Sequence, residues 1–243
     1  MVIELMKSHA SVRKYKEVSL SKEEIHEIVS AGQAAASSHF VQAYAVIHVT
    51  DVEKRTKLAE LAKNPQQING AGAVFVICMD YARLKKAANL LGRDIQFSLA
   101  ENTIVGVTDA GLFAQNMAIA AESLGLGICY IGGVRNAPYE ISELLELPFG
   151  VVPLYGMTVG VADEANEVKP RLPVDAVIHE NAYDLEKYDQ LLPLYDEQLK
   201  AYYQSRRTNQ KDGDWSESMT QFLENPRSEN LRNFLTGKGY KHD

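Results

Sequence analysis

The 243-residue sequence has only two cysteines, Cys78 and Cys129. Both lie in apolar runs that are typical of buried strands, and two such thiols make neither a disulfide framework nor a zinc site. So little cysteine is typical of a protein kept in a reducing compartment. We therefore expect two free, buried thiols and a cytoplasmic location.

The sequence also lacks an excess of basic residues and a long apolar run. Its 25 Lys and Arg against 32 Asp and Glu give a net charge of −7, which disfavours nonspecific attraction to nucleic acid or to an anionic membrane. No segment reaches the roughly 20 apolar residues of a membrane-spanning helix, and the N-terminal MVIELMKSHASVRK has no long apolar signal region. We expect no nucleic-acid or membrane partner, so any phosphate must be bound by local cations.

Familiar catalytic motifs are missing too. Gly125-Leu-Gly127 precedes an expected strand instead of following one, so it lacks the context of a dinucleotide-binding fingerprint. The six histidines show no metal-binding spacing, and no serine stands in a G-x-S-x-G elbow. The sequence thus predicts neither a metal site nor a covalent nucleophile.

The patterns that are present alternate between helix and strand. Ser21-Lys-Glu-Glu24 matches a capping box for a helix from Lys22, and Thr50-Asp-Val-Glu53 repeats this pattern. Apolar runs predict strands at 44–49, 73–80, 127–133 and 151–162, and further helices at about 100–124, 138–147, 185–206 and 215–239. From this alternation alone we expect a parallel, doubly wound sheet, with the only plausible boundary near residue 180.

Cations and small polar residues gather in segments that read as loops. Each has an ordinary explanation as solvated charge, helix cap or turn. Pro170 and Pro173, however, stiffen the EVKPRLP loop, and a stiff loop loses less entropy when its cations bind a ligand. The candidate segments are His9-Ala-Ser-Val-Arg13, Ser37-Ser38-His39, Gln66-Gln67, Gly132-Gly133-Val-Arg135 and Lys169-Pro-Arg171.

Several longer motifs together resemble one family. The chain is similar over nearly its whole length to the NADPH-dependent flavin reductase and oxygen-insensitive nitroreductase branch of the FMN-dependent nitroreductases. AESLGLGICYIGGVRN and KPRLP are specific in combination, and they are joined by HASVRKY, AAASSHFVQAY, AVIHEN, YDEQLKAYY and RTNQKDGDWS. The resemblance implies an α+β three-layer fold with a mostly antiparallel central sheet flanked by helices, which replaces the parallel sheet.

The same resemblance implies a domain plan and a homodimer. Residues 1–180 correspond to the FMN-binding core, and residues 181–243 to a C-terminal helical extension that packs on the core and on the other subunit. Two departures from the family pattern lie near the implied ring site: Ala10 stands where many relatives have Arg, and His39 where many have Ser. They leave the preference for an electron acceptor open.

The resemblance also implies roles for particular residues. Ser11, Arg13, Lys169 and Arg171 correspond to the ligands of the FMN phosphate, with His9 at the border of the pocket. Ser37, Ser38 and His39 lie along the flavin, across the dimer interface, and Gln66 or Gln67 contacts the ring. The resemblance places Tyr130, Ile131, Gly132 and Gly133 at the ring edge. The two glycines present backbone N–H groups to N5 and are the implied catalytic groups. The residues implied for NADPH are Arg135, Arg206 or Arg207, and Lys211.

The implied activity is that of an FMN-dependent NAD(P)H oxidoreductase with two half-reactions. Hydride passes from NADPH, with NADH as a possible reductant, to the flavin and then to a nitroaromatic, quinone, azo compound or free flavin in the same place. Alternatives are a flavin reductase that delivers reduced FMN to a partner, and a non-catalytic FMN-binding sensor. A Rossmann-type dehydrogenase is disfavoured because no fingerprint follows the first strand.

Overall fold

The computed structural model describes residues 2–206, 210, 212–225 and 230–241. Their contacts define two compact units, one of residues 1–166 and 228–243 and the other of residues 167–227. The chain therefore leaves the first unit after Asn166 and returns to it near its C-terminus, whereas the sequence analysis placed a single boundary near residue 180.

The first unit contains a four-stranded sheet with the strand order β1-β2-β4-β3. Every neighbouring pair is antiparallel, so the antiparallel sheet implied by the resemblance is confirmed and the parallel sheet expected from the pattern is wrong. The reason is that β2 is buried at every position, which gives a central antiparallel strand the unbroken apolar run usually seen in parallel sheets. The strands are β1 (Tyr44–His48), β2 (Ala73–Asp80), β3 (Gly127–Ile131) and β4 (Val151–Gly160).

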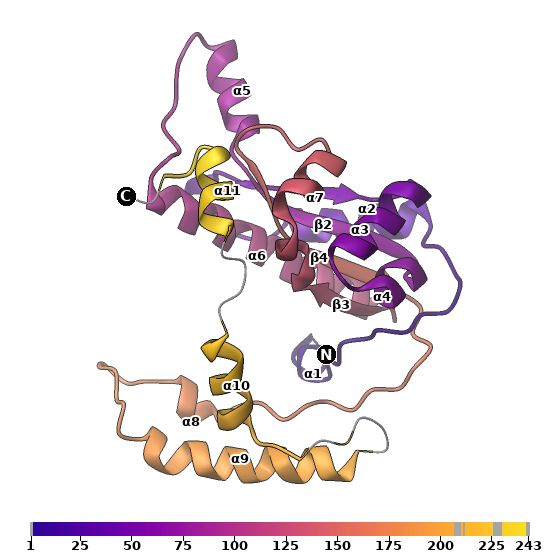
Figure 1. The fold of residues 1–243 in the computed structure, drawn as a ribbon, viewed down its shortest axis with the longest axis vertical. Helices are drawn as coiled ribbons and strands as arrows, with labels where there is room; N and C mark the ends of the chain where they lie inside the picture. The colour runs from indigo at the N-terminus through magenta and orange to yellow at the C-terminus, as the bar shows by residue number, and fades with distance from the viewer. Residues whose placement is uncertain (1, 207–209, 211, 226–229, 242–243) are drawn as a thin grey trace. The chain divides into compact units, whose positions relative to one another are not determined.

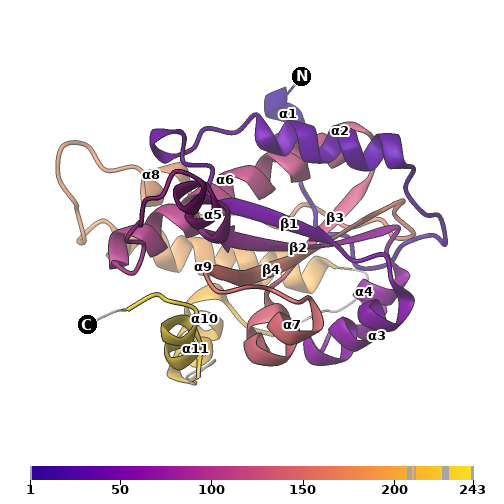
Figure 2. The same ribbon diagram turned by 90° about the horizontal axis from the view of Figure 1, so that it is seen from above.

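Helices cover both faces of this sheet, as Figure 2 shows. Phe75 and Ile77 of β2 pack against the helices of one face, and Val76 and Cys78 pack against those of the other. The three-layer arrangement is therefore confirmed, with the core split into two apolar layers. The covering helices are α2 (Lys22–Gln33) and α6 (Ala100–Ser123) on the first face, and α3 (Val52–Leu61), α4 (Pro65–Gly70) and α7 (Pro138–Leu144) on the second.

The remaining elements are helices and are seen in Figure 1. Those of the first unit are α1 (Val2–Lys7), η1 (Ser38–Phe40), α5 (Ala82–Leu90), η2 (Gly132–Asn136) and α11 (Leu231–Gly237). The second unit holds α8 (Val174–Val177), α9 (Tyr188–Ser205) and α10 (Trp215–Glu224). In the second unit, Asp196 Oδ1 of α9 accepts hydrogen bonds from the N–H groups of Trp215 and Ser216 at 3.0 and 2.9 Å, which joins α10 to α9.

Local capping signals predict the starts of α2 and α3, and the structure corrects the second by one residue. The capping box of α2 is confirmed, since Ser21 Oγ accepts from the Glu24 N–H and the Glu24 carboxylate accepts from the Ser21 N–H. For α3 the cap is Asp51, which accepts from the Lys54 N–H at 2.8 Å, and Thr50 is not the cap. The Val49 N–H still bonds to the β2 side of the sheet, so the helix begins one residue later than the pattern indicated.

Two candidate segments that read as loops are helical. Gln66 and Gln67 lie in the first turn of α4, which begins with Pro65 at a position where proline is favourable. Gly132, Gly133 and Arg135 form the single 3₁₀ turn η2 directly after β3. Both elements are too short to produce a periodic pattern, which explains why the sequence indicated loops.

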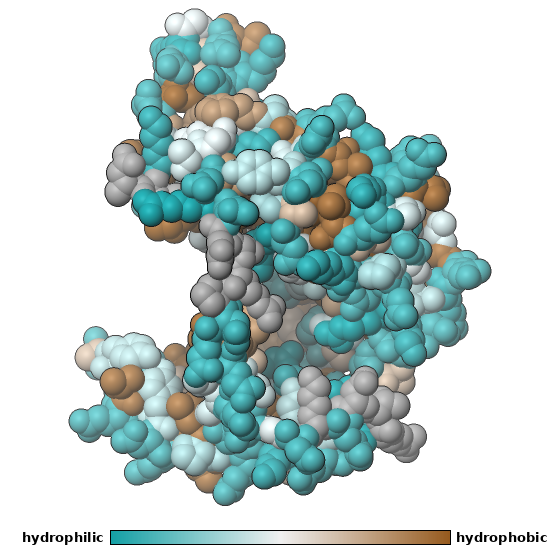
Figure 3. Space-filling model, in the orientation of Figure 1, coloured by the Kyte–Doolittle hydropathy of each residue, from teal (hydrophilic) through white to brown (hydrophobic). Residues whose placement is uncertain are grey.

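The helix α6 is long and apolar enough, by length and composition, to cross a membrane. In this structure it is the central core helix of one sheet face, where Phe113 and Met117 are buried. Its exposed surface still carries large apolar side chains, among them Ile104, Val107 and Leu112. The face of the molecule in Figure 3 is otherwise mostly hydrophilic, with apolar side chains scattered over it.

Candidate functional site

The loop that carries Ser11 and Arg13 lies directly against β3. The N–H of Val12 donates to the Ile128 carbonyl at 2.8 Å, and the Val12 side chain is buried. A Cβ on Gly127 would lie 2.5 Å from Val12 Cγ2, so glycine at this position permits the close approach. Because Val12 faces inward, its neighbours Ser11 and Arg13 are turned toward the surface, and Arg13 is exposed.

Glu164 and Asn166 hold this loop from the chain segment that follows β4. Glu164 Oε1 accepts from the N–H groups of Arg13 and Lys14 at 2.6 and 3.2 Å, and Asn166 donates to the Ser11 carbonyl at 2.9 Å. Partial burial acts to raise the pKa of Glu164, but the hydrogen bonds from Arg13, Asn166 and Lys14 outweigh it and lower the pKa. The sequence analysis missed both anchors, because they lie about 150 residues from the loop.

Three polar side chains of α6 each contact a different candidate segment. Glu122 Oε1 accepts from His9 Nδ1 at 2.5 Å, Gln115 accepts from the Tyr130 hydroxyl at 3.4 Å, and Asp109 accepts from the Ser38 N–H at 2.9 Å. The sequence analysis treated α6 only as a buried apolar helix. The sequence did contain one signal, the acidic residue Asp109 within an apolar helix, because buried acids are rare unless they are hydrogen-bonded.

Ser37, Ser38 and His39 form a tight turn between α2 and β1. The Ser37 hydroxyl accepts from the Gln42 N–H at 3.3 Å, and His39 has a φ of 46°. Ser38 and His39 also line a groove of about 720 Å³ whose other wall includes the stacked rings of Tyr81 and Phe97. Two candidate residues are therefore accessible beside an apolar, aromatic surface.

The structure brings the Gly132-Gly133 turn next to the start of α4. A Cβ on Gly133 would lie 2.0 Å from the Ala62 carbonyl oxygen and 2.7 Å from Asn64 Nδ2, so only glycine fits here. Since Asn64 is followed at once by α4, this contact places η2 beside the helix that carries Gln66 and Gln67. Gly132 is less crowded, because the nearest atom to its added Cβ is the Arg135 guanidinium at 3.3 Å.

The side chains around this turn differ in what they can offer a ligand. Ile131 is 3% exposed and belongs to the core, so only its backbone can face a ligand. Tyr130 is partly exposed and packs edge-on against Tyr155, with ring centroids 5.5 Å apart. Burial raises the pKa of Tyr155 to about 12 and also raises that of Tyr130, which keeps both phenols neutral and able to donate. Arg135 donates to the Leu154 carbonyl at 2.8 Å.

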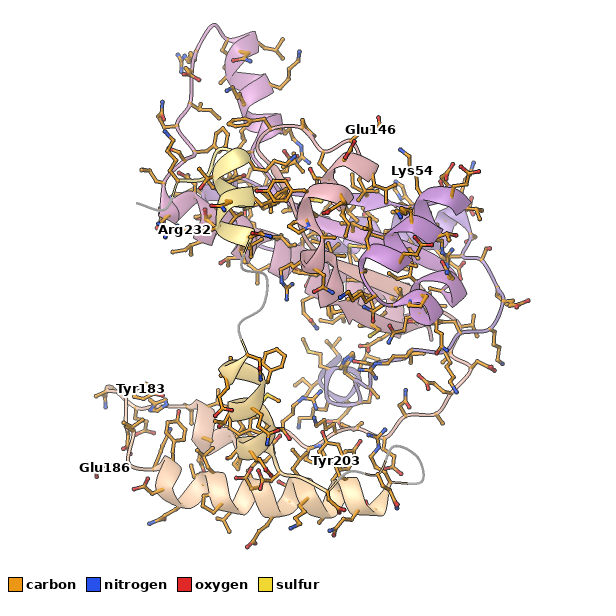
Figure 4. The ribbon with its side chains drawn as sticks, viewed as in Figure 1. Lys54, Glu146, Tyr183, Glu186, Tyr203 and Arg232 are labelled. Carbon is orange, nitrogen blue, oxygen red and sulfur yellow. The ribbon has the colours of Figure 1, made fainter. Side chains whose placement is uncertain are left out.

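The second unit presents Lys169 and Arg171 on a braced loop. Arg171 donates to the Lys169 carbonyl at 2.6 Å, and the buried Tyr195 donates to the Pro170 carbonyl at 3.0 Å. Lys169 Nζ lies 5.1 Å from the ring centroid of Tyr203, which Figure 4 labels on α9. Both cations are exposed, so the loop holds them in place without neutralising them.

The residues predicted for the nicotinamide dinucleotide are described only in part. The guanidinium carbon of Arg206, at the end of α9, lies 5.8 Å from the ring centroid of Tyr202. Arg207 and Lys211 lie outside the described residues.

The chemistry of these groups fits a flavin mononucleotide. Each unit by itself offers groups that suit a phosphate of roughly −1.5 to −2 charge. They are Ser11 and Arg13 in the first unit, and Lys169 and Arg171 in the second. The bare backbone at Gly132, beside the neutral Tyr130, suits a flat ring that needs close approach of an N–H. The donor set therefore supports binding of FMN by this chain.

The matches to known proteins cover nearly the whole chain. The Nitroreductase family model matches residues 6–161, and the model of the Nitroreductase family, C-terminal domain, matches residues 169–243. A Cr(VI) reductase from Pseudomonas sp. strain G-1 is 53% identical over 240 residues, which are 99% of each chain. An FMN reductase (NADPH) from Bacillus subtilis is 40% identical over 243 residues, covering 98% of this chain and 97% of that one.

A solved structure agrees with this assignment. The structure of B. megaterium NfrA1 matches with a TM-score of 0.95 at 40% identity, covering 99% of each chain. The family resemblance expected from the motifs is thereby confirmed, and the chain belongs to the nitroreductase family, in its branch of NADPH-dependent flavin reductases and nitroreductases.

Proposed function

We propose that this chain is an FMN-dependent NAD(P)H oxidoreductase that passes two electrons from NADPH to small-molecule acceptors. The observation that carries the proposal is that each unit presents groups able to bind a phosphate, Ser11 with Arg13 in the first and Lys169 with Arg171 in the second. In each unit a hydrogen bond holds the loop that carries the cations. Glu164 binds the loop of Arg13 in the first unit, and Tyr195 binds the loop of Lys169 and Arg171 in the second. Hydrogen bonds to a charged phosphate contribute about 1.5–3 kcal/mol each.

The turn after β3 provides the ring site. Gly132 and Gly133 present backbone N–H groups at the ring edge, and Gln66 or Gln67 of α4 contacts the ring from the adjoining helix. When bound, FMN supplies the hydride chemistry that no side chain of this protein can perform. The protein's part is to orient the two substrates in turn at one open face and to stabilise the charge of the reduced state by fixed dipoles.

The reductant and the assembly are parts of the same proposal. Arg135, Arg206, Arg207 and Lys211 supply cations for the 2′-phosphate of NADPH, so NADPH is preferred and NADH is used less well. A homodimer, in which Ser37, Ser38 and His39 reach the flavin across the interface, is supported by the exposed apolar side chains of α6. A cytoplasmic location is supported by the two free, buried cysteines.

The acceptors follow from an open site shared by successive substrates. Nitroaromatics, quinones, azo compounds and free flavin all fit a flat aromatic face. The relative at 53% identity is named a Cr(VI) reductase, and we include chromate among the acceptors on that ground. If free flavin is the acceptor, reduced FMN released to a partner is the product, and the rate of its release distinguishes this variant from direct reduction of an acceptor.

The test is the visible spectrum of freshly purified protein before and after anaerobic addition of NADPH. We expect a flavin spectrum that bleaches. A spectrum that persists with NADPH would indicate the non-catalytic sensor, and the absence of flavin even after addition of FMN would contradict the proposal.

Arg171→Ala tests the phosphate site within the same measurement. We expect largely colourless protein, with FMN affinity lowered by about tenfold or more because one ionic contact is lost. Lys200→Ala, which removes another exposed cation of the same unit, is the matched control and keeps its flavin. Full retention of flavin by Arg171→Ala would remove Arg171 from the site.

A further inference from the structure

The loop from Ser37 to Ala43 has an unusual backbone. His39, Phe40 and Gln42 have φ values of 46°, 60° and 52°, in the left-handed region that side chains other than glycine rarely adopt. Three such residues within four positions persist only where surrounding contacts hold them. Phe40 is 80% exposed, so its own side chain contributes little to that restraint.

Asp109 of α6 restrains this loop through two hydrogen bonds. Its Oδ1 accepts from the Ser38 N–H at 2.9 Å and its Oδ2 accepts from the Ala43 N–H at 3.1 Å. These two amides stand on either side of the three positive-φ residues. One carboxylate therefore fixes both ends of the turn, and each of its two oxygens accepts a hydrogen bond.

Arg83 holds the carbonyl groups of the same segment. Its guanidinium donates to the Tyr44 carbonyl at 2.9 Å and to the Gln42 carbonyl at 3.4 Å, and it pairs with Asp80 at 3.2 Å. Asp109 itself is 1% exposed, and no lysine or arginine in the part of the chain that the structure describes forms an ion pair with it. Its two oxygens are held by the Ser38 and Ala43 backbone amides, and burying a carboxyl group is costly unless such hydrogen bonds are kept.

We propose that Asp109 is the positioning residue that holds Ser38 and His39 in the conformation in which they meet the flavin. The part of this inference that concerns FMN rests on the proposed function. The part that concerns the anchoring of the turn by Asp109 does not depend on a ligand. Asp109 does not touch the cofactor in this account; it acts through the Ser37–Ala43 turn, and the groove lined by Ser38 and His39 depends on the same anchor.

Amide hydrogen exchange tests the anchor without activity as the readout. Asp109→Asn keeps the shape of the side chain but replaces one acceptor by an NH₂ group that faces an N–H donor. We expect the Ser38 and Ala43 amides to exchange about tenfold faster or more in this variant. Asp109→Ala, which removes both acceptors, should extend the loss of protection over the whole turn. If Asp109→Ala does not fold, the isosteric Asp109→Asn still decides the question.

Flavin titration tests the connection to the cofactor. In Asp109→Asn we expect an FMN dissociation constant raised by about tenfold and a changed shape of the bound-flavin absorption band, because the turn that meets the flavin loses one of the hydrogen bonds that hold it. Val49→Ala is the matched control, since Val49 is buried at the other end of β1. It should lower thermal stability while the flavin spectrum and the exchange of the Ser38 amide stay unchanged.

The outcomes separate this inference from the proposed function. Wild-type protein that binds no FMN contradicts the proposed function and the flavin part of the inference, while the exchange experiment still decides whether Asp109 anchors the turn. Unchanged exchange at Ser38 and Ala43 in Asp109→Asn overturns the anchor. Faster exchange with unaltered flavin affinity and spectrum overturns the role of the turn in binding the cofactor.

Discussion

At the scale of single residues, the two neighbouring glycines of η2 meet different constraints. Gly133 leaves no room for a Cβ, which would lie 2.0 Å from the Ala62 carbonyl oxygen, whereas an added Cβ on Gly132 would lie 3.3 Å from the Arg135 guanidinium. Both were predicted as catalytic from the family resemblance. Gly133 therefore also has a structural reason to be glycine, whereas a Cβ on Gly132 would require only a small shift of the Arg135 guanidinium.

Alanine substitution separates these two roles. We expect Gly133→Ala to lower the free energy of unfolding by about 1–3 kcal/mol, because overpacking forces η2 away from the Ala62–Asn64 turn, and to weaken FMN binding as a result. Gly132→Ala should keep the stability of the wild type but slow flavin reduction by NADPH. Urea unfolding and anaerobic stopped-flow absorbance measure the two effects. Equal stability losses in both variants would show that Gly132 is held by packing as well.

At the scale of elements, α4 is positioned by one side chain of α3. Arg55 donates to the carbonyls of Ile68 at 2.8 Å, of Asn69 at 3.1 Å, and of Ala71, at the end of α4 where carbonyl groups lack helical partners. Burial lowers the pKa of Arg55. Since α4 carries Gln66 and Gln67, this contact sets where those amides stand.

Removing that contact should loosen α4 more than it affects the rest of the unit. Arg55→Met keeps much of the apolar stem, and we expect it to cost about 1–3 kcal/mol of stability because several carbonyls lose their donor, with weaker FMN binding. Lys57→Met, in the same helix, removes only an exposed pair with Glu60 and should cost less than about 0.5 kcal/mol. Urea unfolding midpoints and FMN titrations of both variants give the comparison, and similar losses for the two would contradict a special role for Arg55.

The elements show how far the sequence could predict the fold. The starts of α2 and α6 and the cores of all four strands follow from local signals such as the Ser21 capping box and the apolar run of β2. The direction of the strands does not follow from such signals. A strand covered on both faces has the same unbroken apolar pattern in a parallel and in an antiparallel sheet. The short elements α4 and η2 give no periodic signal, so the candidate residues on them were placed in loops.

The candidate site divides in the same way. Ser11, Arg13 and the EVKPRLP cations could be proposed from the sequence because they belong to recognisable local motifs. Their anchors were not, since Glu164 and Asp109 bind backbone groups 151 and 71 residues away in sequence, and pairings of that kind leave no local pattern. The assignment of the cofactor came from the family resemblance, which the comparisons confirm.

At the scale of the whole molecule, Lys54 and Glu146 illustrate how surface charge contributes to this acidic protein. They pair at 2.7 Å between α3 and the segment after α7, as Figure 4 shows, and Lys54 lowers the pKa of Glu146. The Glu146 contribution is present above the ordinary pKa of about 4.3 and is lost below it. Its neutral-pH effect is small because the pair is exposed.

A different group, His48, contributes to the pH dependence of stability in the window between its lowered pKa in the folded protein and its ordinary pKa of about 6.5. Burial, with a smaller contribution from Arg55, lowers the pKa of His48 below 6.5 in the folded protein, while the unfolded chain regains the ordinary value. In that window the unfolded state binds more protons, so the stabilisation is fully present above about pH 6.5 and is lost as the pH falls toward the folded pKa. We expect the free energy of unfolding to decline with acidification there, and His48→Gln to flatten the decline. Urea unfolding measured across this range, with His26→Gln on the exposed face of α2 as the control, decides the matter: an unchanged slope in His48→Gln would assign the acid sensitivity to another group.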